Sequence, residues 1–381
     1  MAFDKPHAMM VDEAHDEHAR MGFVASYKSY LTNEVSGGSR VVYEARVRPT
    51  AKRELKAEPD RHEIRRRIVR EPFFQMVSSL RRTSQEMIWD STGECVARQT
   101  KDLIDRAKTY SRRDGVGSLR LTPGLVSPRY LTAVDIHCMP GNYTSDLTAD
   151  DVFAGALYDI GAYQYGMGGQ GPMTNDVGLT AVKYLKETNP KFKPKKILDL
   201  GCGVGHQTLA LVEGFPEAEV YACDLGAPMV RYGHARAETL GKRVHFSQQN
   251  AEHTDFADES FDLVTSLILF HETSYKAIFN VMKECYRVLK PGGIMVHGDV
   301  PEFNQFWPDP YDQFQREWTT HFNAEPFRSK MRDMDMKAIA ADLGFNKKSI
   351  VETRLRSPFS SPLYAKTHAY GAMWWVMAAQ K

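Results

Sequence analysis

The pattern of hydrophobic and polar residues divides the chain into two parts that meet near residue 150. Before that point, apolar residues such as Ile64, Ile68 and Val77 recur at the spacing of one helix face. After residue 195, short apolar runs of strand length alternate with helical patterns, from 196–200 to the last two runs at 349–355 and 372–379. This alternation predicts an α/β fold with a mainly parallel sheet.

The N-terminal part is expected to be mainly helical. Its first forty residues have the mixed charge of a helix, and two further helices are predicted on either side of Pro72. Their outer faces are basic, with Arg65, Arg66, Arg67, Arg70, Arg81 and Arg82. Turn residues over 115–128 predict a loop or short hairpin, and residues 131–138 predict a strand.

Composition narrows the class of protein. A chain of 381 residues suggests two domains, and a net charge of +1 does not indicate a nucleic-acid or membrane partner. We expect a cytoplasmic protein, because there is no signal-peptide pattern and no apolar run long enough to span a membrane. The five cysteines are scattered, which favours neither a disulfide framework nor a zinc site. His15 and His18 have a spacing that suits a metal, but without a third ligand we interpret them as a solvated helix face and expect no metal.

The first strong chemical signal follows the strand at 196–200. That strand leads into Asp199-Leu-Gly-Cys-Gly-Val-Gly205, and a helix is predicted from about His206. A tight glycine turn lets the backbone approach a ligand at a helix N-terminus. A dinucleotide-binding G-x-G-x-x-G motif would need a third glycine where this chain has His206. The glycine turn alone therefore does not choose between a dehydrogenase and another nucleotide-binding protein.

Four downstream signals make the choice. A second predicted strand, 219–224, ends in Asp224, and an acid there can accept hydrogen bonds from ribose hydroxyls. A third strand at 244–248 precedes Asn250, and a fourth spans 260–266. A helix then ends at Lys290-Pro-Gly-Gly293, before a fifth strand at 294–297.

In this order and at these spacings, the five motifs resemble the class I S-adenosylmethionine-dependent methyltransferase family. The resemblance covers about residues 150–300 closely and the rest of the C-terminal part more loosely. It implies a Rossmann-like seven-stranded sheet, mostly parallel with the last strand antiparallel, and helices on both faces. We therefore expect a cofactor-binding domain over 150–381. A mainly helical accessory domain over 1–149, which resembles no family we can name, would shape the substrate pocket or form a homodimer.

The resemblance also implies the cofactor, S-adenosylmethionine, and the residues that bind it. Asp199 and the glycine loop would hold its methionine end, and Asp224 its ribose. Leu225 would pack on the adenine, beside Asn250, where the family often has aspartate. A helix expected over 152–164 would cover the cofactor and bring a tyrosine hydroxyl to its carboxylate, unless its tyrosines (Tyr158, Tyr163 and Tyr165) serve only in packing. The expected contacts are Asp199, Gly201, Cys202, Gly203, Gly205, Asp224, Leu225, Asn250, Ala251, Glu252, Ser266 and Tyr163.

Methyl transfer from a sulfonium depends largely on alignment and desolvation, and a base is needed only when the acceptor must lose a proton. His271, which follows the fourth strand, is the best candidate for a general base. The alternative is that it packs beside the cofactor or caps the next helix; Glu272 is expected to be structural. Aromatic residues over 303–322 suggest a lid on an organic substrate, within an insertion at about 301–330, or else a local hydrophobic cluster.

We therefore expect an enzyme that methylates a small organic acceptor at oxygen, nitrogen, carbon or sulfur. The alternative is a nucleic-acid methyltransferase or binding protein that uses the arginine-rich helices. Against it, the fourth strand lacks both the Asn/Asp-Pro-Pro-aromatic motif and the Pro-Cys nucleophile of base methyltransferases. A non-enzymatic module should have lost the glycine loop, which is intact here. A dehydrogenase is disfavoured by His206 and by Lys290-Pro-Gly-Gly293.

Overall fold

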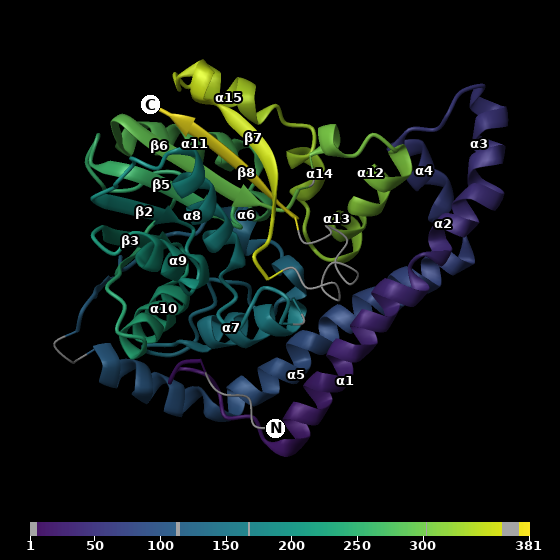
Figure 1. Cartoon of the computed structure of the whole chain (residues 1–381). Coiled ribbons are helices and arrows are strands. Elements are labelled where there is room, and N and C mark those ends of the chain that lie inside the picture. Colours follow the sequence, from purple (N-terminus) through teal and green to yellow (C-terminus); the bar gives the residue numbers. More distant parts are fainter. Residues whose placement is uncertain (1–5, 112–114, 167, 302, 360–372) are drawn as a thin grey trace.

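The fold is built on one eight-stranded sheet. A computed structural model describes residues 6–111, 115–166, 168–301, 303–359 and 373–381. The strand order is β1-β4-β3-β2-β5-β6-β8-β7 (Figure 1). The strands are β1 Ser118–Arg120, β2 Lys196–Leu200, β3 Glu219–Asp224, β4 His245–Gln248, β5 Phe261–Leu267, β6 Leu289–Asp299, β7 Val351–Arg356 and β8 Met373–Gln380.

The sheet confirms the expected α/β class. Strands β1 to β6 pair in parallel, and β8 is antiparallel to both β6 and β7, between which it is inserted. The eighth strand is β1, which lies in the segment expected to be a loop or hairpin and pairs with β4. Its three residues are too few to show a strand period. A tertiary contact orders this strand: the Glu238 carboxylate accepts a hydrogen bond from the backbone N–H of Gly117, just before the strand.

Helices cover both faces of the sheet, as expected. From β2 through β3 to β4 the chain moves toward one edge of the sheet, and the helices α9 (His206–Gly214) and α10 (Ala227–Thr239) connect these strands. Because such crossovers are right-handed, both helices lie on the same face. The same rule places α11 (Tyr275–Val288) and α15 (Met336–Asp342) on the other face. Helix α8 (Asp176–Thr188) packs on α9, and α7 (Phe153–Tyr165) packs on α10.

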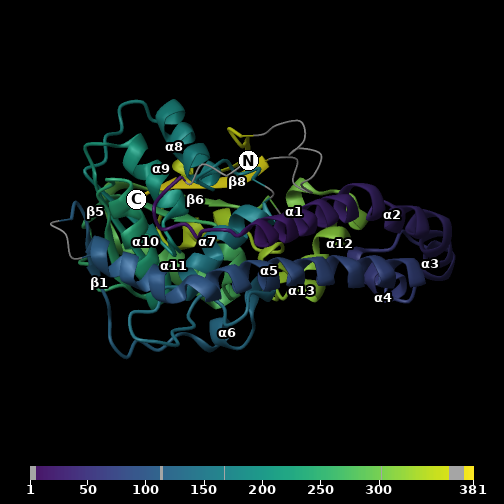
Figure 2. The same ribbon diagram turned by 90° about the horizontal axis from the view of Figure 1, so that it is seen from below.

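The N-terminal part forms a long helical arm. Helix α1 (His15–Tyr30) continues through two short π-helical turns and α2 (Gly38–Val42) into α3 (Arg48–Leu55). The chain returns through α4 (Arg61–Ile68) and the 40-residue α5 (Pro72–Ser111), and part of the arm extends well beyond the sheet (Figures 1 and 2). The predicted break at Pro72 is confirmed, since α4 ends before it and α5 begins with it.

Helix α5 joins the arm to the sheet-bearing part through a shared core. Trp89 and Cys95 of α5 belong to the same buried cluster as Leu157 of α7 and Met229 of α10. Gly161 lets α7 approach closely, because a Cβ there would lie 2.2 Å from the Trp89 ring. The residues before 150 are therefore packed onto the sheet-bearing part and can contribute to a site on it.

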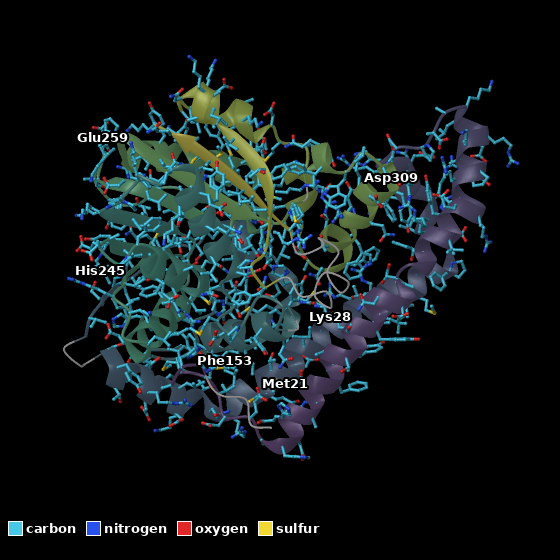
Figure 3. All side chains as sticks on the ribbon, in the orientation of Figure 1. Met21, Lys28, Phe153, His245, Glu259 and Asp309 are labelled. Carbon is cyan, nitrogen blue, oxygen red and sulfur yellow. The ribbon has the colours of Figure 1, made fainter. Side chains whose placement is uncertain are left out.

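The aromatic segment after β6 packs against the N-terminal arm. It contains α12 (Pro310–Arg316), α13 (Trp318–Phe322) and α14 (Arg328–Met331). Tyr311 packs on Tyr43 of the arm with ring centroids 4.7 Å apart, and Phe314 packs on Phe74 at 5.6 Å. Asp309 lies at the side that faces the arm, where it pairs with Arg40 (Figure 3). This packing favours the alternative, a hydrophobic cluster that these aromatics form with the arm, and the lid stays a prediction.

The strand expected at 131–138 is absent. The segment holds α6 (Arg129–Thr132) and a 3₁₀ turn at Ile136–Cys138. His137 and Cys138 have φ angles of +55° and +62°, which no strand contains. The carbonyl of His137 accepts hydrogen bonds from Gln85 Nε2 at 2.9 Å and Trp89 Nε1 at 2.6 Å. These two side chains of α5 hold the turn, so it is set by tertiary contacts and not by local propensity.

Candidate active site

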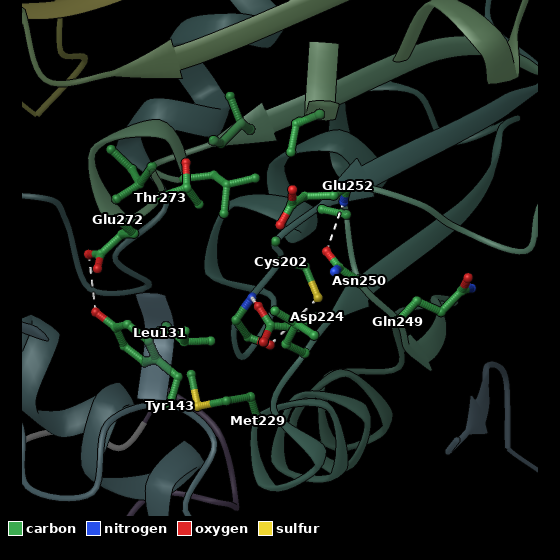
Figure 4. Close-up of a pocket in the computed structure, with 18 of the residues that line it drawn as sticks. Leu131, Tyr143, Cys202, Asp224, Met229, Gln249, Asn250, Glu252, Glu272 and Thr273 are labelled. Carbon is green, nitrogen blue, oxygen red and sulfur yellow. Dashed lines mark hydrogen bonds between the residues drawn. The ribbon is translucent and has the colours of Figure 1, made fainter. Parts of the chain in front are cut away.

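One cavity of about 880 Å³ lies at the carboxyl ends of β2, β3, β4 and β5, where ligands bind in open α/β sheets (Figure 4). Its walls come from the loops after these strands and from the N-terminal part of the chain. The residues that line it include Tyr130, Leu131, Tyr143, Tyr158, Gly201, Cys202, Gly203, Asp224, Leu225, Met229, Gln249, Asn250, Ala251, Glu252, Leu269, Glu272 and Thr273.

The glycine loop after β2 forms the floor. Gly201, Gly203 and Gly205 have φ angles of +69°, +54° and +78°, a region that favours glycine. A Cβ on Gly201 would lie 2.5 Å from a methyl group of Leu269, so the close turn also depends on the missing side chain. Gly205 is the N-cap of α9, whose N-terminus can attract negative charge.

Asp199 lies beneath the loop and not in the cavity wall. Its carboxylate is 1% exposed and accepts hydrogen bonds from Thr208 Oγ1 at 2.6 Å and Thr265 Oγ1 at 2.9 Å. Burial raises the pKa of Asp199 to about 6, although the two threonines oppose the rise. The residue braces the turn from β2 into the loop.

Asp224 ends β3 and lines the cavity. Its two oxygens accept the backbone N–H groups of Gly203 and Gly226, each at 2.9 Å, so the carboxylate is held across the glycine loop (Figure 4). Burial raises the pKa of Asp224 above its ordinary value. A carboxylate fixed in this way keeps free lone pairs that can accept hydrogen bonds from a ligand.

The loop after β4 supplies Asn250, Ala251 and Glu252. Asn250 Oδ1 accepts the backbone N–H of Glu252 at 2.9 Å (Figure 4). The Glu252 carboxylate is held from two sides, by the Tyr130 hydroxyl at 2.9 Å and by Asn280 Nδ2 at 2.8 Å. The N-terminal part thus anchors this wall through Tyr130 of α6.

Of the twelve residues expected to contact the cofactor, eight line the cavity: Gly201, Cys202, Gly203, Asp224, Leu225, Asn250, Ala251 and Glu252. Ser266 is buried and hydrogen-bonds His297 Nδ1 at 2.5 Å. Tyr163 lines a separate cavity with His7 and Asp159, and Tyr158 of the same helix lines this one. Five helical residues turn the side chain by about 140°, so the two tyrosines point to different sides.

Sequence reasoning expected the N-terminal part to shape the substrate pocket, but it did not identify the residues that do so. Tyr130, Leu131 and Tyr143 all line the cavity, although they precede the first predicted strand of the sheet by more than fifty residues. Their local sequence carries no motif. The turn residues around them gave no sign of a site, because the contact with the sheet edge depends on how α5 packs.

A buried polar cluster forms one end of the cavity, at the loop after β5. Glu272 Oε1 lies 2.6 Å from His137 Nε2 and 3.1 Å from His271 Nε2, and it accepts a 3.1 Å hydrogen bond from the Tyr143 hydroxyl. Burial disfavours the charge of Glu272, but the two imidazoles outweigh burial and lower its pKa below the ordinary value. Glu272, expected to be structural, is therefore part of the cavity wall (Figure 4).

His271 stands behind Glu272 and is 3% exposed. Its Nδ1 lies 2.6 Å from Asp299 Oδ1. Burial opposes protonation of His271, but Asp299 and Glu272 raise its pKa to about 10. In this arrangement the imidazole holds its proton, so its expected role as a base stays a prediction.

The comparisons with known proteins agree with the motifs. A family model described as a methyltransferase domain matches residues 197–293. The demethylmenaquinone methyltransferase of Thermus thermophilus is 39% identical over 108 residues, which are 28% of this chain and 48% of that protein. The malonyl-[acyl-carrier protein] O-methyltransferase of Methylococcus capsulatus is 29% identical over 54% of this chain and 70% of that protein.

Among solved structures, phosphoethanolamine N-methyltransferase 2 of Haemonchus contortus is similar with a TM-score of 0.41 and 18% identity, over 59% of this chain and 58% of that one. The chain spans about half the length of the demethylmenaquinone methyltransferase that it matches. The family model identifies a methyltransferase domain over residues 197–293, and the motifs and the cavity lining resemble those of class I S-adenosylmethionine-dependent methyltransferases. Within the described ranges, no helix is long and apolar enough to cross a membrane.

Proposed function

We propose that the protein transfers a methyl group from S-adenosylmethionine to a small organic acceptor. The observation that supports this most is the composition of the cavity at the carboxyl ends of the strands. One end carries the glycine loop and Asp224, and the other carries the buried pair Tyr143 and Glu272. A nucleotide-type site and a second polar site therefore share one enclosure at the edge of the sheet.

The residues at the first end fit the cofactor. The glycine loop permits close backbone approach, and the Asp224 carboxylate is fixed at the end of β3, where a ribose is bound in related folds. Asn250 uses its carbonyl oxygen internally, which leaves its amide nitrogen for an adenine. When bound, S-adenosylmethionine supplies an electrophilic methyl group on a sulfonium.

The second end would hold the acceptor. Apolar Leu131 and Leu269 exclude water there, and Tyr143 and Glu272 offer a hydroxyl and a carboxylate for orientation. Holding the acceptor in line with the methyl group accounts for much of the rate enhancement in such a displacement. His271 acts through Glu272 in this arrangement and remains the proposed base for an acceptor that must lose a proton.

Binding of S-adenosylhomocysteine, measured by calorimetry, tests the cofactor end. We expect Asp224→Ala to weaken binding about 10- to 100-fold, the range for losing hydrogen bonds to a charged group. Asp258→Ala is the matched control, because that carboxylate is exposed and pairs with Arg287 outside the cavity. Equal affinities in the two variants would contradict the proposed cofactor site.

The acceptor class is tested with isotope-labelled S-adenosylmethionine. The protein is incubated with a fractionated metabolite extract and, separately, with total RNA and protein from the same cells. We expect label in low-molecular-mass compounds, and its loss with Asp224→Ala. Label that enters RNA or protein and no small molecule would overturn the proposal of a small organic acceptor.

A further inference from the structure

Three potential metal-ligand atoms converge at the acceptor end of the cavity. His137, His271 and Glu272 each place one ligand atom within 4.8 Å of the other two. They come from distant parts of the chain: His137 from the 3₁₀ turn before the sheet, and the other two from the loop after β5. Two imidazoles and one carboxylate are a common ligand set for a transition metal and an uncommon one for Mg²⁺ or Ca²⁺.

Both histidines are oriented in the way that metal-binding histidines are. His271 Nδ1 lies 2.6 Å from Asp299 Oδ1, and His137 Nδ1 lies 3.3 Å from Glu325 Oε1. In each ring, a carboxylate outside the cluster holds Nδ1, and Nε2 points to Glu272. A carboxylate that holds the other ring nitrogen in this way fixes the tautomer and the ring orientation of a metal-binding histidine and raises its basicity.

The backbone at His137 is held in an unfavourable conformation. Its φ of +55° is rare for a residue with a side chain, and such strain persists only where surrounding contacts determine it. Gln85 and Trp89 both donate to the His137 carbonyl and supply those contacts. The fold thus maintains a strained turn whose result is to bring the His137 ring to Glu272.

Glu272 has coordination capacity left. Its Oε2 atom is buried and has no hydrogen-bond partner among the described residues, although Oε1 is surrounded by donors. A buried carboxylate oxygen without a partner is costly, and a bound cation would satisfy it. When both imidazoles are neutral, as metal ligands must be, the three carboxylates of the cluster (Glu272, Asp299 and Glu325) face one arginine within the described ranges, Arg328, which pairs with Glu325.

We propose that His137 Nε2, His271 Nε2 and the Glu272 carboxylate bind one divalent transition-metal ion of the zinc or iron(II) kind. The ion takes the place of the proton on each Nε2, and these protons are released on binding, so His271 is then a ligand and not a base. Tetrahedral ligand atoms about 2.0–2.2 Å from such an ion lie about 3.3–3.6 Å from one another. The separations between the imidazole nitrogens and Glu272 Oε1, 2.6 and 3.1 Å, are shorter than this by about 1 Å or less. Small side-chain rotations are therefore enough to admit the ion.

From the position of the ion we infer that it binds the methyl acceptor, an inference that rests on the proposed function. Glu272 and Tyr143 line the cavity, whereas His137 and His271 are not among the residues that line it. Three protein ligands leave one or more coordination positions open, and these would face the acceptor. The acceptor class is then an organic molecule that presents a hydroxyl, carboxylate or amine to the metal.

Metal content tests the site without any assay of methyl transfer. The full-length protein is stripped with a chelator, dialysed against micromolar Zn²⁺ and analysed for zinc. We expect one zinc per chain in the wild type and at least a tenfold lower occupancy in His137→Ala and in Glu272→Gln. His245→Gln is the matched control, because His245 also lies beside a glutamate, Glu219 at 3.5 Å, but at the far side of the sheet (Figure 3).

Two further measurements keep the proposal testable if a variant does not fold. Wild-type protein loaded with Co²⁺ should show visible d–d absorption bands without thiolate charge transfer, and Zn²⁺ should raise its unfolding temperature above that in chelator. Failure of the wild type to bind zinc, or full occupancy in both folded variants, would overturn the metal site. S-adenosylhomocysteine binding in the same samples shows whether the cofactor site stands independently of that result.

Discussion

Asp299 at the end of β6 holds both the ring and the backbone of His271. Its Oδ1 lies 2.6 Å from His271 Nδ1, and its Oδ2 accepts the backbone N–H groups of Phe270 at 2.9 Å and of His271 at 3.3 Å. One buried carboxylate therefore positions the whole turn after β5. Because that turn carries Glu272 into the cavity, Asp299 is a positioning residue for the acceptor end of the site.

Asp299→Asn should separate catalysis from cofactor binding. The amide preserves the size of the side chain but weakens its hold on the His271 ring, and losses of 10- to 100-fold are typical for such outer partners. We expect kcat to fall by about that factor. The affinity for S-adenosylhomocysteine should stay within about threefold, since Asp299 does not line the cavity. An equal loss in both quantities would indicate a general structural role.

Two tyrosines of α7 provide a matched pair for the cofactor site. Tyr158 lines the cavity and stacks on His206 with ring centroids 5.5 Å apart, whereas Tyr163 lines another cavity. Tyr158→Ala removes aromatic surface beside the glycine loop and should weaken S-adenosylhomocysteine binding by about tenfold. Tyr163→Ala should leave the affinity unchanged in the same calorimetric titration. The reverse order of effects would restore Tyr163 as the cofactor contact.

Trp318 distinguishes a structural cluster from a substrate lid. It is 5% exposed, its indole N–H donates to Ser78 Oγ at 3.1 Å, and Arg81 lies 3.8 Å above its ring. Trp318→Ala should lower the free energy of unfolding by about 3–5 kcal/mol in urea titrations. Phe23→Ala, at a side chain that is 61% exposed, should change it by less than about 0.5 kcal/mol. A stable Trp318→Ala with a raised KM for the acceptor would favour the lid.

The motif-bearing half of the fold was predictable from the sequence. Strands β2 and β3 have the predicted bounds, because each is an apolar run that ends in an acid or a glycine turn. Helix α5 begins at the proline that the pattern indicated. Eight of the expected cofactor residues line the cavity for the same reason: the loops after parallel strands meet at one edge of the sheet.

The acceptor end was not predictable, because it depends on contacts between distant segments. His137 reaches Glu272 only through a turn with positive φ that Gln85 and Trp89 hold from another helix. Nothing in the residues around 137 favours that conformation, and the pattern there predicted a strand. The aromatics after β6 were likewise ambiguous, since a hydrophobic run does not say whether a cavity or a neighbouring helix covers it.

The arginine-rich helices should not support nucleic-acid binding. Arg66 and Arg67 both pair with Glu63 of the same helix, and Arg61 pairs with Glu317 across the interface with α13. Filter binding at about 150 mM salt should give a Kd for RNA no tighter than the non-specific range of about 10⁻⁴ to 10⁻⁶ M. Glu63→Gln, which removes the carboxylate partner of Arg66 and leaves Arg67 paired with Glu54, should bind more tightly and with a steeper salt dependence. Tight, salt-sensitive binding by the wild type would favour the alternative function.

The stability of the protein should depend on pH through Asp176, the first residue of α8. Asp176 Oδ2 accepts hydrogen bonds from Ser357 Oγ at 2.8 Å and from Trp374 Nε1 at 2.7 Å, but Oδ1 has no partner within the described ranges. Burial raises the pKa of Asp176 from 3.8 to about 6, against the effect of these two donors. Because the folded pKa lies above the unfolded one, the folded state binds the proton more tightly. This contribution to stability therefore grows as the pH falls from above 6 towards 4.

Urea unfolding of the wild type and of Asp176→Asn at pH 7.5 and pH 5.0 measures this contribution. Between these values, Asp176 should add about 1.4 kcal/mol to the free energy of unfolding of the wild type at the lower pH. Asp176→Asn cannot take up the proton. The difference in free energy of unfolding between the wild type and the variant should therefore shift by that amount in favour of the wild type when the pH is lowered from 7.5 to 5.0. The exposed Asp258→Asn should follow the wild type. A gap that is the same at both pH values would show that Asp176 is charged throughout, and that its unpartnered oxygen is satisfied in some other way.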